Sequence, residues 1–295
     1  FAVAVNRDGA IYAWGNNSMG QLGINKLEQK NSFVQVGTGL NWESIGADGY
    51  TPLAIKTDKS VWSWGTNTSG QMGDGTVVSK NFPVQITSIS NIKTVSAAAP
   101  NHALAIKTDG SLWAWGNNYY GQLGLSDLTD RSSPVQVGAL TNWSSISCGD
   151  YYTTVIKTDG TLWSWGYNNV GQLGISNTAD RSSPVQVLQP SINSPIRYTY
   201  LQSKELTSTN NEILATSKID NRIFQSSPSE LPTVDPTATW KSIGSGMEHF
   251  VGIKTDGTAW SLGNNSYGQL GISNLTYKSS LVQIGSRSDW KKVYC

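Results

Sequence analysis

The sequence predicts an all-β fold made of repeated four-stranded units. Three features support this prediction: a fixed period, hairpin turns and paired aromatic residues. The phrase IKTDGSLWAWGNNYYGQLG and its near copies occupy residues 5–23, 55–73, 106–124, 156–174 and 253–271. The turn aspartates of the first four copies are 50, 51 and 50 residues apart. A period near 50 residues, with short apolar runs inside it, is typical of the blades of a β-propeller.

The strands of one repeat can be read from Pro134 onward. The expected strands are PVQV at 134–137, WSSIS at 143–147, TTVIK at 153–157 and TLWSWG at 161–166. The turn Thr158-Asp159-Gly160 joins the last two. Asp-Gly between alternating apolar runs is a strong hairpin signal, because glycine accepts a positive φ and aspartate hydrogen-bonds locally. We therefore expect four short strands in each blade.

Paired aromatic residues close each hairpin and are expected to form the core between blades. The pairs are Tyr12 and Trp14, Trp62 and Trp64, Trp113 and Trp115, and Trp163 and Trp165, with Trp260 and Leu262 in the last copy. Residues two apart in a strand point to the same face of the sheet. Each ring can remove about 150–250 Å² from water, so stacking of blade on blade should be the main source of stability.

A loop ending in Gly-Gln-Leu-Gly follows each aromatic pair. The copies lie at 20–23, 121–124, 171–174 and 268–271, and Met replaces Leu in the copy at 70–73. We expect the Gln amide to satisfy buried backbone groups and the Leu to fill the core, so the loop should be a packed bridge between blades. A phosphate-binding loop is excluded because no Gly-Lys-Ser/Thr follows.

The phrase Trp-Gly-x-Asn-x-x-Gly-Gln-Leu-Gly, followed by Ser-Ser-Pro-Val-Gln-Val, resembles the repeat of the regulator of chromosome condensation (RCC1) family. The resemblance covers nearly the whole chain and implies an RCC1-like β-propeller. Known members include a nucleotide exchange factor, an enzyme inhibitor and a light receptor, so the resemblance implies architecture rather than one chemistry. The regular TDG and DRSSPVQV phrasing is similar to that of bacterial and phage members.

The repeats predict a single propeller domain over residues 1–295, with six blades as the first expectation and seven as the alternative. The expected repeats lie near 1–33, 34–83, 84–134, 135–184, 185–233 and 234–281, with closing strands at 282–295. The repeat at 185–233 is degenerate: Asp220 is its turn aspartate, and Pro190–Asn211 carries extra residues. Its divergence is explained either by sequence drift at a site that tolerates change or by a specialised face of the propeller.

The two chain ends are expected to share the closing blade. Val282–Ile284 and Trp290–Cys295 would join Phe1–Gly15, because DWKKVYC matches NWSSISC and FAVAVNRDG matches YTTVIKTDG. Such closure would remove exposed strand edges. The chain opens on Phe1 rather than Met, so we expect either a processed chain or part of a longer one.

Composition and motifs argue against catalysis. Lys and Arg number 21 against 20 for Asp and Glu, so we expect no binding of nucleic acid and no membrane insertion. The two histidines, His102 and His249, lie in different repeats, and no acid or nucleophile is spaced for a triad. No His/Cys cluster has zinc spacing, and no calcium loop is present. We expect no enzyme, no metal and no cofactor.

The loops between the second and third strands, counted from Pro134, differ from repeat to repeat. Varied loops on a rigid scaffold are where binding residues concentrate. The candidate binding residues are Tyr50, Asn101, His102, Tyr151, Tyr152, Glu248 and His249, which we expect on one face. The alternative is ordinary loop variation, and for the two histidines a structural role.

These features lead to two functional hypotheses. The first is a non-catalytic binding or structural propeller that contacts a protein or glycan through one loop face. It would act on a virion, as a phage tail or capsid decoration, or on a bacterial surface, within a larger assembly. Only 14% of residues are charged, which favours such an exterior. The alternative is a regulatory, cytoplasmic propeller acting on a partner enzyme, as a GTPase exchange factor or an inhibitor.

Overall fold

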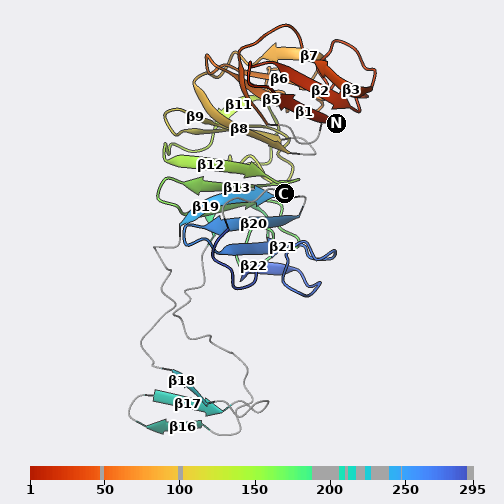
Figure 1. The fold of residues 1–295 in the computed structure, drawn as a ribbon. Coiled ribbons are helices and arrows are strands. Elements are labelled where there is room, and N and C mark those ends of the chain that lie inside the picture. Colours follow the sequence, from red (N-terminus) through yellow and green to blue (C-terminus); the bar gives the residue numbers. More distant parts are fainter. Residues whose placement is uncertain are drawn as a thin grey trace. The chain divides into compact units, whose positions relative to one another are not determined.

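The chain folds into antiparallel β-sheets. The computed structural model describes residues 1–46, 50–98, 102–187, 206–209, 212–216, 223–226, 239–246 and 248–290. In these ranges every regular element is a strand, and the strands form six sheets (Figure 1). The chain divides into two compact units, one of Phe1–Val187 with Ala238–Cys295, and the other of Leu188–Thr237.

The larger unit contains one three-stranded and four four-stranded sheets. The first sheet consists of β1 (Ala2–Val5), β2 (Ile11–Gly15) and β3 (Lys30–Gln35). The second consists of β4 (Trp42–Gly46), β5 (Leu53–Lys56), β6 (Val61–Gly65) and β7 (Lys80–Gln85). The third consists of β8 (Ile92–Ala98), β9 (His102–Lys107), β10 (Leu112–Gly116) and β11 (Arg131–Gln136). The fourth consists of β12 (Trp143–Cys148), β13 (Tyr152–Lys157), β14 (Leu162–Gly166) and β15 (Arg181–Gln186). The fifth consists of β19 (Trp240–Ser245), β20 (His249–Lys254), β21 (Ala259–Gly263) and β22 (Lys278–Gln283).

The predicted hairpins are confirmed. In the fourth sheet β13 pairs with β14, and Val155 lies opposite Trp163. Asp159 Oδ1 accepts hydrogen bonds from the backbone N of Thr161 at 2.9 Å and from its Oγ1 at 2.7 Å. Gly160 has a φ of 80°, which the turn requires and which glycine adopts without a steric cost. The repeated Asp-Gly therefore marks a turn and not a carboxylate site.

The boundary between blades differs from the repeat that begins at Pro134. The strand that contains Pro134 is β11, and it pairs with β10 of the preceding hairpin, where Ala114 lies opposite Val135. The physical reason is that the Gly-Gln-Leu-Gly loop returns the chain to the open edge of the sheet it has just left. Each complete blade thus starts at the strand that begins with Trp42, Ile92, Trp143 or Trp240 and ends with the strand after the loop.

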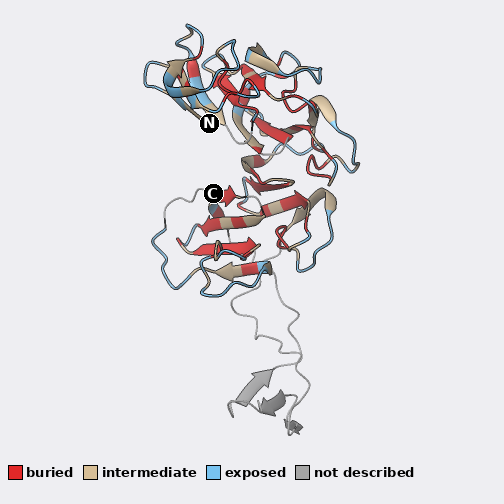
Figure 2. Cartoon of the chain, turned by 90° about the vertical axis from the view of Figure 1, so that its right-hand side faces the viewer, coloured by how far each residue is buried: buried red, intermediate tan, exposed pale blue. Residues whose placement is uncertain are grey.

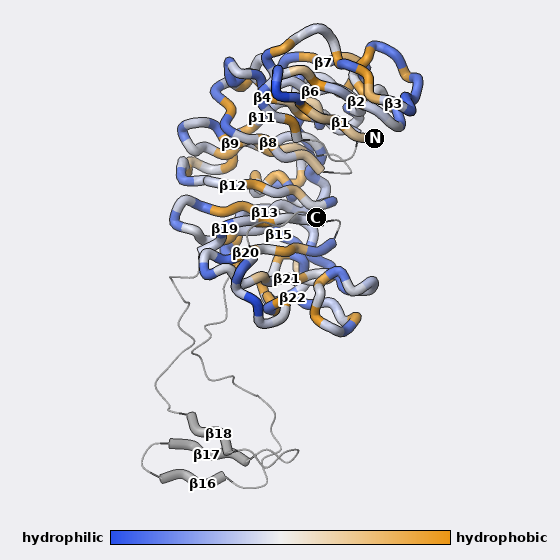
Figure 3. The backbone as a smooth tube through the Cα atoms, viewed as in Figure 1, coloured by the Kyte–Doolittle hydropathy of each residue, from blue (hydrophilic) through white to orange (hydrophobic). Residues whose placement is uncertain are grey.

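Four hydrophobic clusters lie between successive blades of the larger unit. The cluster between β8–β11 and β12–β15, for example, brings Leu112 and Leu123 of one blade against Trp143 and Trp165 of the next. Figure 2 shows the buried residues along the strands and the exposed residues in the loops, and Figure 3 shows apolar strand segments alternating with hydrophilic loops. The predicted core between blades is confirmed for three of the pairs: Trp64, Trp115 and Trp165 are fully buried, while their partners Trp62, Trp113 and Trp163 are half-buried. The first pair differs, because Trp14 is 37% exposed.

The Gly-Gln-Leu-Gly loop bridges neighbouring blades, as predicted. Trp165 Nε1 donates to the backbone O of Gln122 at 2.9 Å, and the same bond joins Trp115 to Gln71 and Trp64 to Gln21. The Gln122 side chain accepts from the backbone N of Tyr120 at 2.9 Å. Leu123 is fully buried. The loop is therefore a packed structural element that fixes one blade to the next.

The blade that follows β12–β15 is β19–β22. Ser176 N donates to Ser279 O at 3.1 Å, as Ser126 N donates to Ser182 O between the preceding two blades. Ile156 and Leu162 pack in one cluster with residues of the last blade. The degenerate repeat expected at 185–233 stays a prediction, because most of these residues lie outside the described part of the chain.

Within the smaller unit, β16 (Leu206–Thr209), β17 (Glu212–Thr216) and β18 (Ile223–Ser226) form a three-stranded antiparallel sheet. Thr216 lies opposite Ile223, so two paired strands flank the position of Asp220, as the degenerate hairpin predicts. Most of Pro190–Asn211, including Pro190 and Asn211 themselves, and Asp220 lie outside the described residues. A single domain over residues 1–295 stays a prediction.

The closing blade is only in part as predicted. Val282 lies opposite Ser261, so the segment from Val282 completes the fifth sheet and does not join the N-terminal one. Among the described residues, the sheet β1–β2–β3 has no counterpart of β4, β8, β12 and β19, which contact one another from blade to blade. Trp290 N donates to Gly257 O at 3.2 Å, as Trp143 N does to Gly110 O at the start of β12. Residues 291–295 lie outside the described residues, so their pairing with β1 stays a prediction.

The part of the chain that the structure describes holds no helix with the length and apolar character needed to cross a lipid bilayer.

We predict that Gly124→Ala destabilises the fold more than Gly138→Ala. Both glycines have a positive φ, 71° and 60°, so each alanine costs about 1–2 kcal/mol of backbone strain. A Cβ at Gly124 would lie 2.7 Å from Trp165 Nε1, whereas a Cβ at Gly138 would meet nothing within 4 Å. Urea denaturation should show an additional loss of about 1–3 kcal/mol for Gly124→Ala. Equal losses for the two variants would contradict the bridging role of the loop.

Candidate functional site

The predicted site residues lie in the loops between the first and second strands of the observed blades. They fall into two sets of equivalent positions. The outer set is Tyr50, Asn101, Tyr151 and Glu248, and the next residue along the chain forms the inner set, Thr51, His102, Tyr152 and His249. Asn101 lies outside the described residues. The described members of the two sets have different surroundings.

His102 is a buried contact between two blades. Its exposed fraction is 1%, and its Nε2 lies 3.1 Å from Thr153 Oγ1 in the next blade. Because Thr153 Oγ1 donates to the backbone O of Gln122 at 2.8 Å, the histidine must donate through Nε2–H. Its Nδ1 has no hydrogen-bond partner among the described residues. Burial lowers the pKa of His102 to about 3, so this side chain is neutral at pH 7.

Tyr152 and His249 also serve the contact between blades. Tyr152 is fully buried, and its hydroxyl donates to Gly246 O at 3.1 Å and lies within hydrogen-bonding reach of His249 O. The ring of each lies against the loop glycine before it, so that a Cβ at Gly149 or Gly246 would overlap it. Burial lowers the pKa of His249. Both side chains thus pack against the loop that precedes them, and a binding role for either stays a prediction.

Tyr151 of the outer set is half-buried and contributes to a cluster of tyrosines. The rings of Tyr151 and Tyr120 lie 5.1 Å apart, those of Tyr120 and Tyr167 4.3 Å apart, and those of Tyr151 and Tyr167 6.2 Å apart. Tyr120 comes from the loop after β10, while Tyr151 and Tyr167 flank β13 and β14 of the next blade. We call Tyr120, Tyr151 and Tyr167 the tyrosine patch.

The tyrosine patch includes two residues that the sequence did not single out. Tyr167 occupies a position that holds Asn16, Thr66, Asn117 and Asn264 in the other copies of the loop. The backbone of this position is fixed, because Tyr167 N donates to Tyr151 O at 2.9 Å and Asn264 N donates to Glu248 O at 2.8 Å. The available signal was an aromatic residue at a position that holds asparagine or threonine in the other copies. This residue is easily overlooked in the sequence, because other positions of the same loop also vary among the copies.

Carboxylates border the tyrosine patch. Partial burial is the main cause of a raised pKa for Tyr167, and the charges of Glu248 and Asp180 contribute in the same direction. Partial burial and the Asp150 charge likewise raise the pKa of Tyr151. Two of these carboxylates are held in place: Glu248 Oε2 accepts from Asn264 Nδ2 at 2.7 Å, and Asp180 Oδ1 accepts from Asn168 N at 2.7 Å. We call Glu248 and Asp180 the acidic rim.

Tyr50 and Glu248 do not join the aromatic cluster directly. Tyr50 is 52% exposed and lies two blades before Tyr151, so it presents a separate tyrosine on the equivalent loop. Glu248 lies one blade after Tyr151 and reaches the patch through its charge on Tyr167. The structure thus brings together Tyr151 and Glu248 from the predicted set. It leaves Tyr50 apart and places His102, Tyr152 and His249 in supporting positions.

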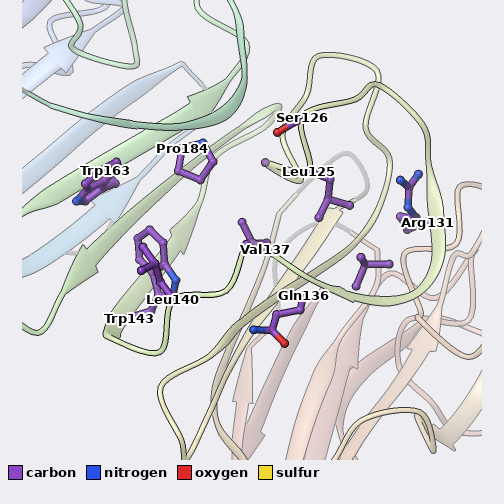
Figure 4. A pocket seen from close by; sticks show the side chains of 12 residues that line it. Leu125, Ser126, Arg131, Gln136, Val137, Leu140, Trp143, Trp163 and Pro184 are labelled. Carbon is purple, nitrogen blue, oxygen red and sulfur yellow. The ribbon is translucent and has the colours of Figure 1, made fainter.

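A separate groove of about 480 Å³ opens between β8–β11 and β12–β15 (Figure 4). Its apolar walls include Leu125, Val137, Leu140, Trp143 and Trp163. Leu140 is 49% exposed, whereas Ile89 at the equivalent position of the preceding blade is buried. The groove therefore results from one side chain that leaves the core. Its lining also includes the polar residues Ser126, Arg131 and Gln136.

Over the described ranges, no three His, Cys, Asp or Glu side chains gather as ligands for a metal ion. The tyrosine patch and its acidic rim present ring area, phenol hydroxyls and carboxylates to solvent. Tyrosine adds contact area with few rotors, which is why it is favoured at protein interfaces. This arrangement is suited to binding.

The comparisons with known proteins agree with this architecture. The regulator of chromosome condensation (RCC1) repeat matches residues 8–39, 58–106, 109–156 and 159–198. A second model of that repeat matches 92–122, 143–172 and 240–269. The Ultraviolet-B receptor UVR8 of Arabidopsis thaliana is 31% identical over 204 residues, which cover 68% of this chain and 36% of the receptor. The chain spans between 10% and 36% of the length of the curated relatives it matches.

Two solved structures share the fold over 96% of this chain. Human WBSCR16 has a TM-score of 0.72 at 20% identity, with 64% of its own chain covered. Prp20p from Saccharomyces cerevisiae, whose binding to Gsp1p and histones is described with its structure, has a TM-score of 0.55 at 19% identity, with 74% covered. The molecule is thus an RCC1-like β-propeller. This chain belongs to the RCC1 repeat family.

The relatives named above are eukaryotic. The similar proteins come from a plant, from human and from yeast. A bacterial or phage origin stays a prediction.

We predict that His102 makes the fold less stable as the pH falls below 6.5. The unfolded chain binds a proton at this residue near its ordinary pKa of 6.5, whereas the folded chain stays neutral to about pH 3. The free energy of unfolding should therefore fall by about 1.4 kcal/mol per pH unit in this window, or about 2 kcal/mol between pH 6.5 and 5. Denaturation of wild type and of His102→Gln at pH 6.5 and at pH 5 measures the contribution of His102 to this fall, because glutamine does not titrate but can still donate to Thr153.

The control is His249→Gln, which removes the other histidine of the chain. The pKa of His249 is also lowered, so His249→Gln should likewise reduce the loss of stability on going from pH 6.5 to pH 5. A difference between wild type and His102→Gln that does not change with pH would show that His102 titrates normally in the folded state.

Proposed function

We propose that this RCC1-like propeller is a non-catalytic scaffold that binds a protein partner through the tyrosine patch. The observation that supports this proposal is the joining of three tyrosines from two blades, bordered by a carboxylate from a third. The propeller core is built from repeated residues that fix blade to blade. The patch is built from residues that depart from the repeat, so it has no part in that packing pattern and is free to serve recognition.

A protein is a better partner than a glycan for this surface. Tyrosines that pack edge to face against one another, at interplanar angles of 70° and 77°, form a rigid area suited to protein side chains. The two blades that carry them are joined by the Trp165 bond to Gln122, so the surface is preorganised. A preorganised surface loses little entropy on binding.

The setting that we propose is the surface of a virion or a bacterium, with the chain part of a larger assembly. The support is compositional: only 14% of residues are charged, and serine, threonine and asparagine fill the loops. Quantitative proteomics of purified virions or of surface-shaved cells tests this setting. Recovery of the chain only from the cytoplasm would favour the regulatory alternative.

The second candidate function is regulation of a partner enzyme, which the likeness to Prp20p favours. Under this alternative the loop face would cover a small GTPase and change its nucleotide exchange. A panel of small GTPases loaded with fluorescent nucleotide tests it. Specific acceleration of nucleotide release would replace the structural scaffold by an exchange factor.

We predict that Tyr120→Ser, Tyr151→Ser and Tyr167→Ser, combined in one variant, abolish capture of the partner without unfolding the propeller. These rings are partly exposed, and their loss removes contact area while the tryptophan core stays intact. The measurement is affinity purification from the native source with quantitative mass spectrometry, alongside thermal denaturation of each variant.

The matched control is Tyr267→Ser. Tyr267 occupies the position of Tyr120 in the last copy of the loop and is 94% exposed. The control should recover the same partner as wild type. A partner recovered equally by the triple variant would exclude the tyrosine patch as its binding surface, and recovery on immobilised glycans alone would exclude a protein partner.

A further inference from the structure

We infer that the tyrosine patch and the acidic rim bind a cationic segment of the partner, with lysine or arginine side chains lying on the tyrosine rings. This inference rests on the proposed function and names the chemistry of its partner. Its support comes from three features of the surface: the spacing of the rings, the sign of the bordering charges and the use of the same contact elsewhere in this chain.

The rings form a continuous aromatic surface. Tyr119 lies 4.8 Å from Tyr120 at an interplanar angle of 83°, and it is 69% exposed, so it extends the cluster outward. Tyr120 and Tyr167 are tilted by 44° at 4.3 Å. A cation is attracted to a ring face within about 6 Å of its centre, and arginine can also stack on it. A cation over an open face of one ring therefore also lies near the neighbouring ring.

The same chain already uses this interaction in its core. Lys157 Nζ lies 3.6 Å from the ring centre of Trp163 and 4.8 Å from that of Trp143. Lys56 lies 3.8 Å from Trp62 in an equivalent arrangement. Among the described residues, no lysine or arginine lies over a ring of the tyrosine patch. The aromatic surface is thus left for a cation supplied from outside these residues.

The local charge has the sign that a cation needs. Apart from the neighbouring tyrosines, the groups whose charge raises the pKa of Tyr167 are Glu248 and Asp180, and Asp150 acts in the same way on Tyr151. These three are carboxylates, although the whole chain carries a net charge of only +1. An acidic ligand would be repelled by this rim. A purely apolar ligand would cover phenol hydroxyls and carboxylates without replacing their hydration, which costs free energy. A cationic segment satisfies both the rings and the rim.

Binding of two fluorescein-labelled probe peptides tests the inference. One alternates glycine with arginine, and the other alternates glycine with glutamate. Fluorescence anisotropy should show that wild type binds the arginine probe at least about tenfold more tightly than the glutamate probe at low salt, and that this preference shrinks as salt screens the rim. The triple tyrosine-to-serine variant should lose the preference, and Tyr267→Ser should keep it.

Two further variants separate the rings from the rim. Replacing the three tyrosines by phenylalanine keeps the ring faces and should retain the preference. Glu248→Gln and Asp180→Asn keep the oxygen acceptors for Asn264 and for the backbone of Asn168, so the loops should hold. Each substitution should weaken the affinity for the arginine probe by about two- to fivefold, which is the effect expected from removing one partly exposed charge.

The outcomes distinguish this inference from the proposed function. If the triple serine variant loses its natural partner but wild type does not prefer the arginine probe, the patch binds a protein and the cationic chemistry is wrong. If the preference for arginine persists in the triple serine variant, the cation binds elsewhere and the inference is wrong. If neither partner nor probe depends on the patch, both proposals fail.

Discussion

The contact of a tryptophan with the glycine loop of the preceding blade is the interaction on which the larger unit depends. Trp165 donates to Gln122 O, and its indole lies so close to Gly124 that no other residue fits there without displacement. The same contact recurs between the earlier blades, with Trp115 against Gly73 and Trp64 against Gly23. At the last junction Leu262 takes the place of the tryptophan against Gly174. Because a blade has no core of its own, this contact both buries its aromatic face and sets its position.

The tight packing of the repeat explains where recognition can occur. Residues that recur in each copy are committed to turns, loop bridges and the core, and their replacement affects the neighbouring blade. Function is therefore left to positions that vary among copies. Tyr120, Tyr151 and Tyr167 occupy such positions on two adjacent blades. His102 and Tyr152 show that a position that varies among the copies can also be structural, since both form bonds between blades.

The stability of the blades also gives the tyrosine patch its character. Tyr167 N donates to Tyr151 O, which fixes the backbone beneath these two rings. Tyr120 N donates to the Gln122 side chain, which fixes the backbone beneath the third ring. The rings thus stand on backbone that the core holds fixed. A surface of this kind can select a partner by charge and ring geometry without a lid or a catalytic group.

The sequence by itself determined the strands, the Asp-Gly turns, the buried tryptophans and the structural role of the Gly-Gln-Leu-Gly loop, because these follow from local periodicity and from the conformations that glycine and aspartate adopt. It could also indicate Tyr151 and Glu248 as members of a variable loop face. Only the tertiary structure decided that the strand of Pro134 joins the preceding hairpin, that β19–β22 follows β12–β15, and that Tyr120 meets Tyr151 and Tyr167. These outcomes depend on contacts between residues far apart in the chain. Because the repeats are nearly identical, local sequence allows several pairings equally well, and the packing of whole blades determines which of them forms.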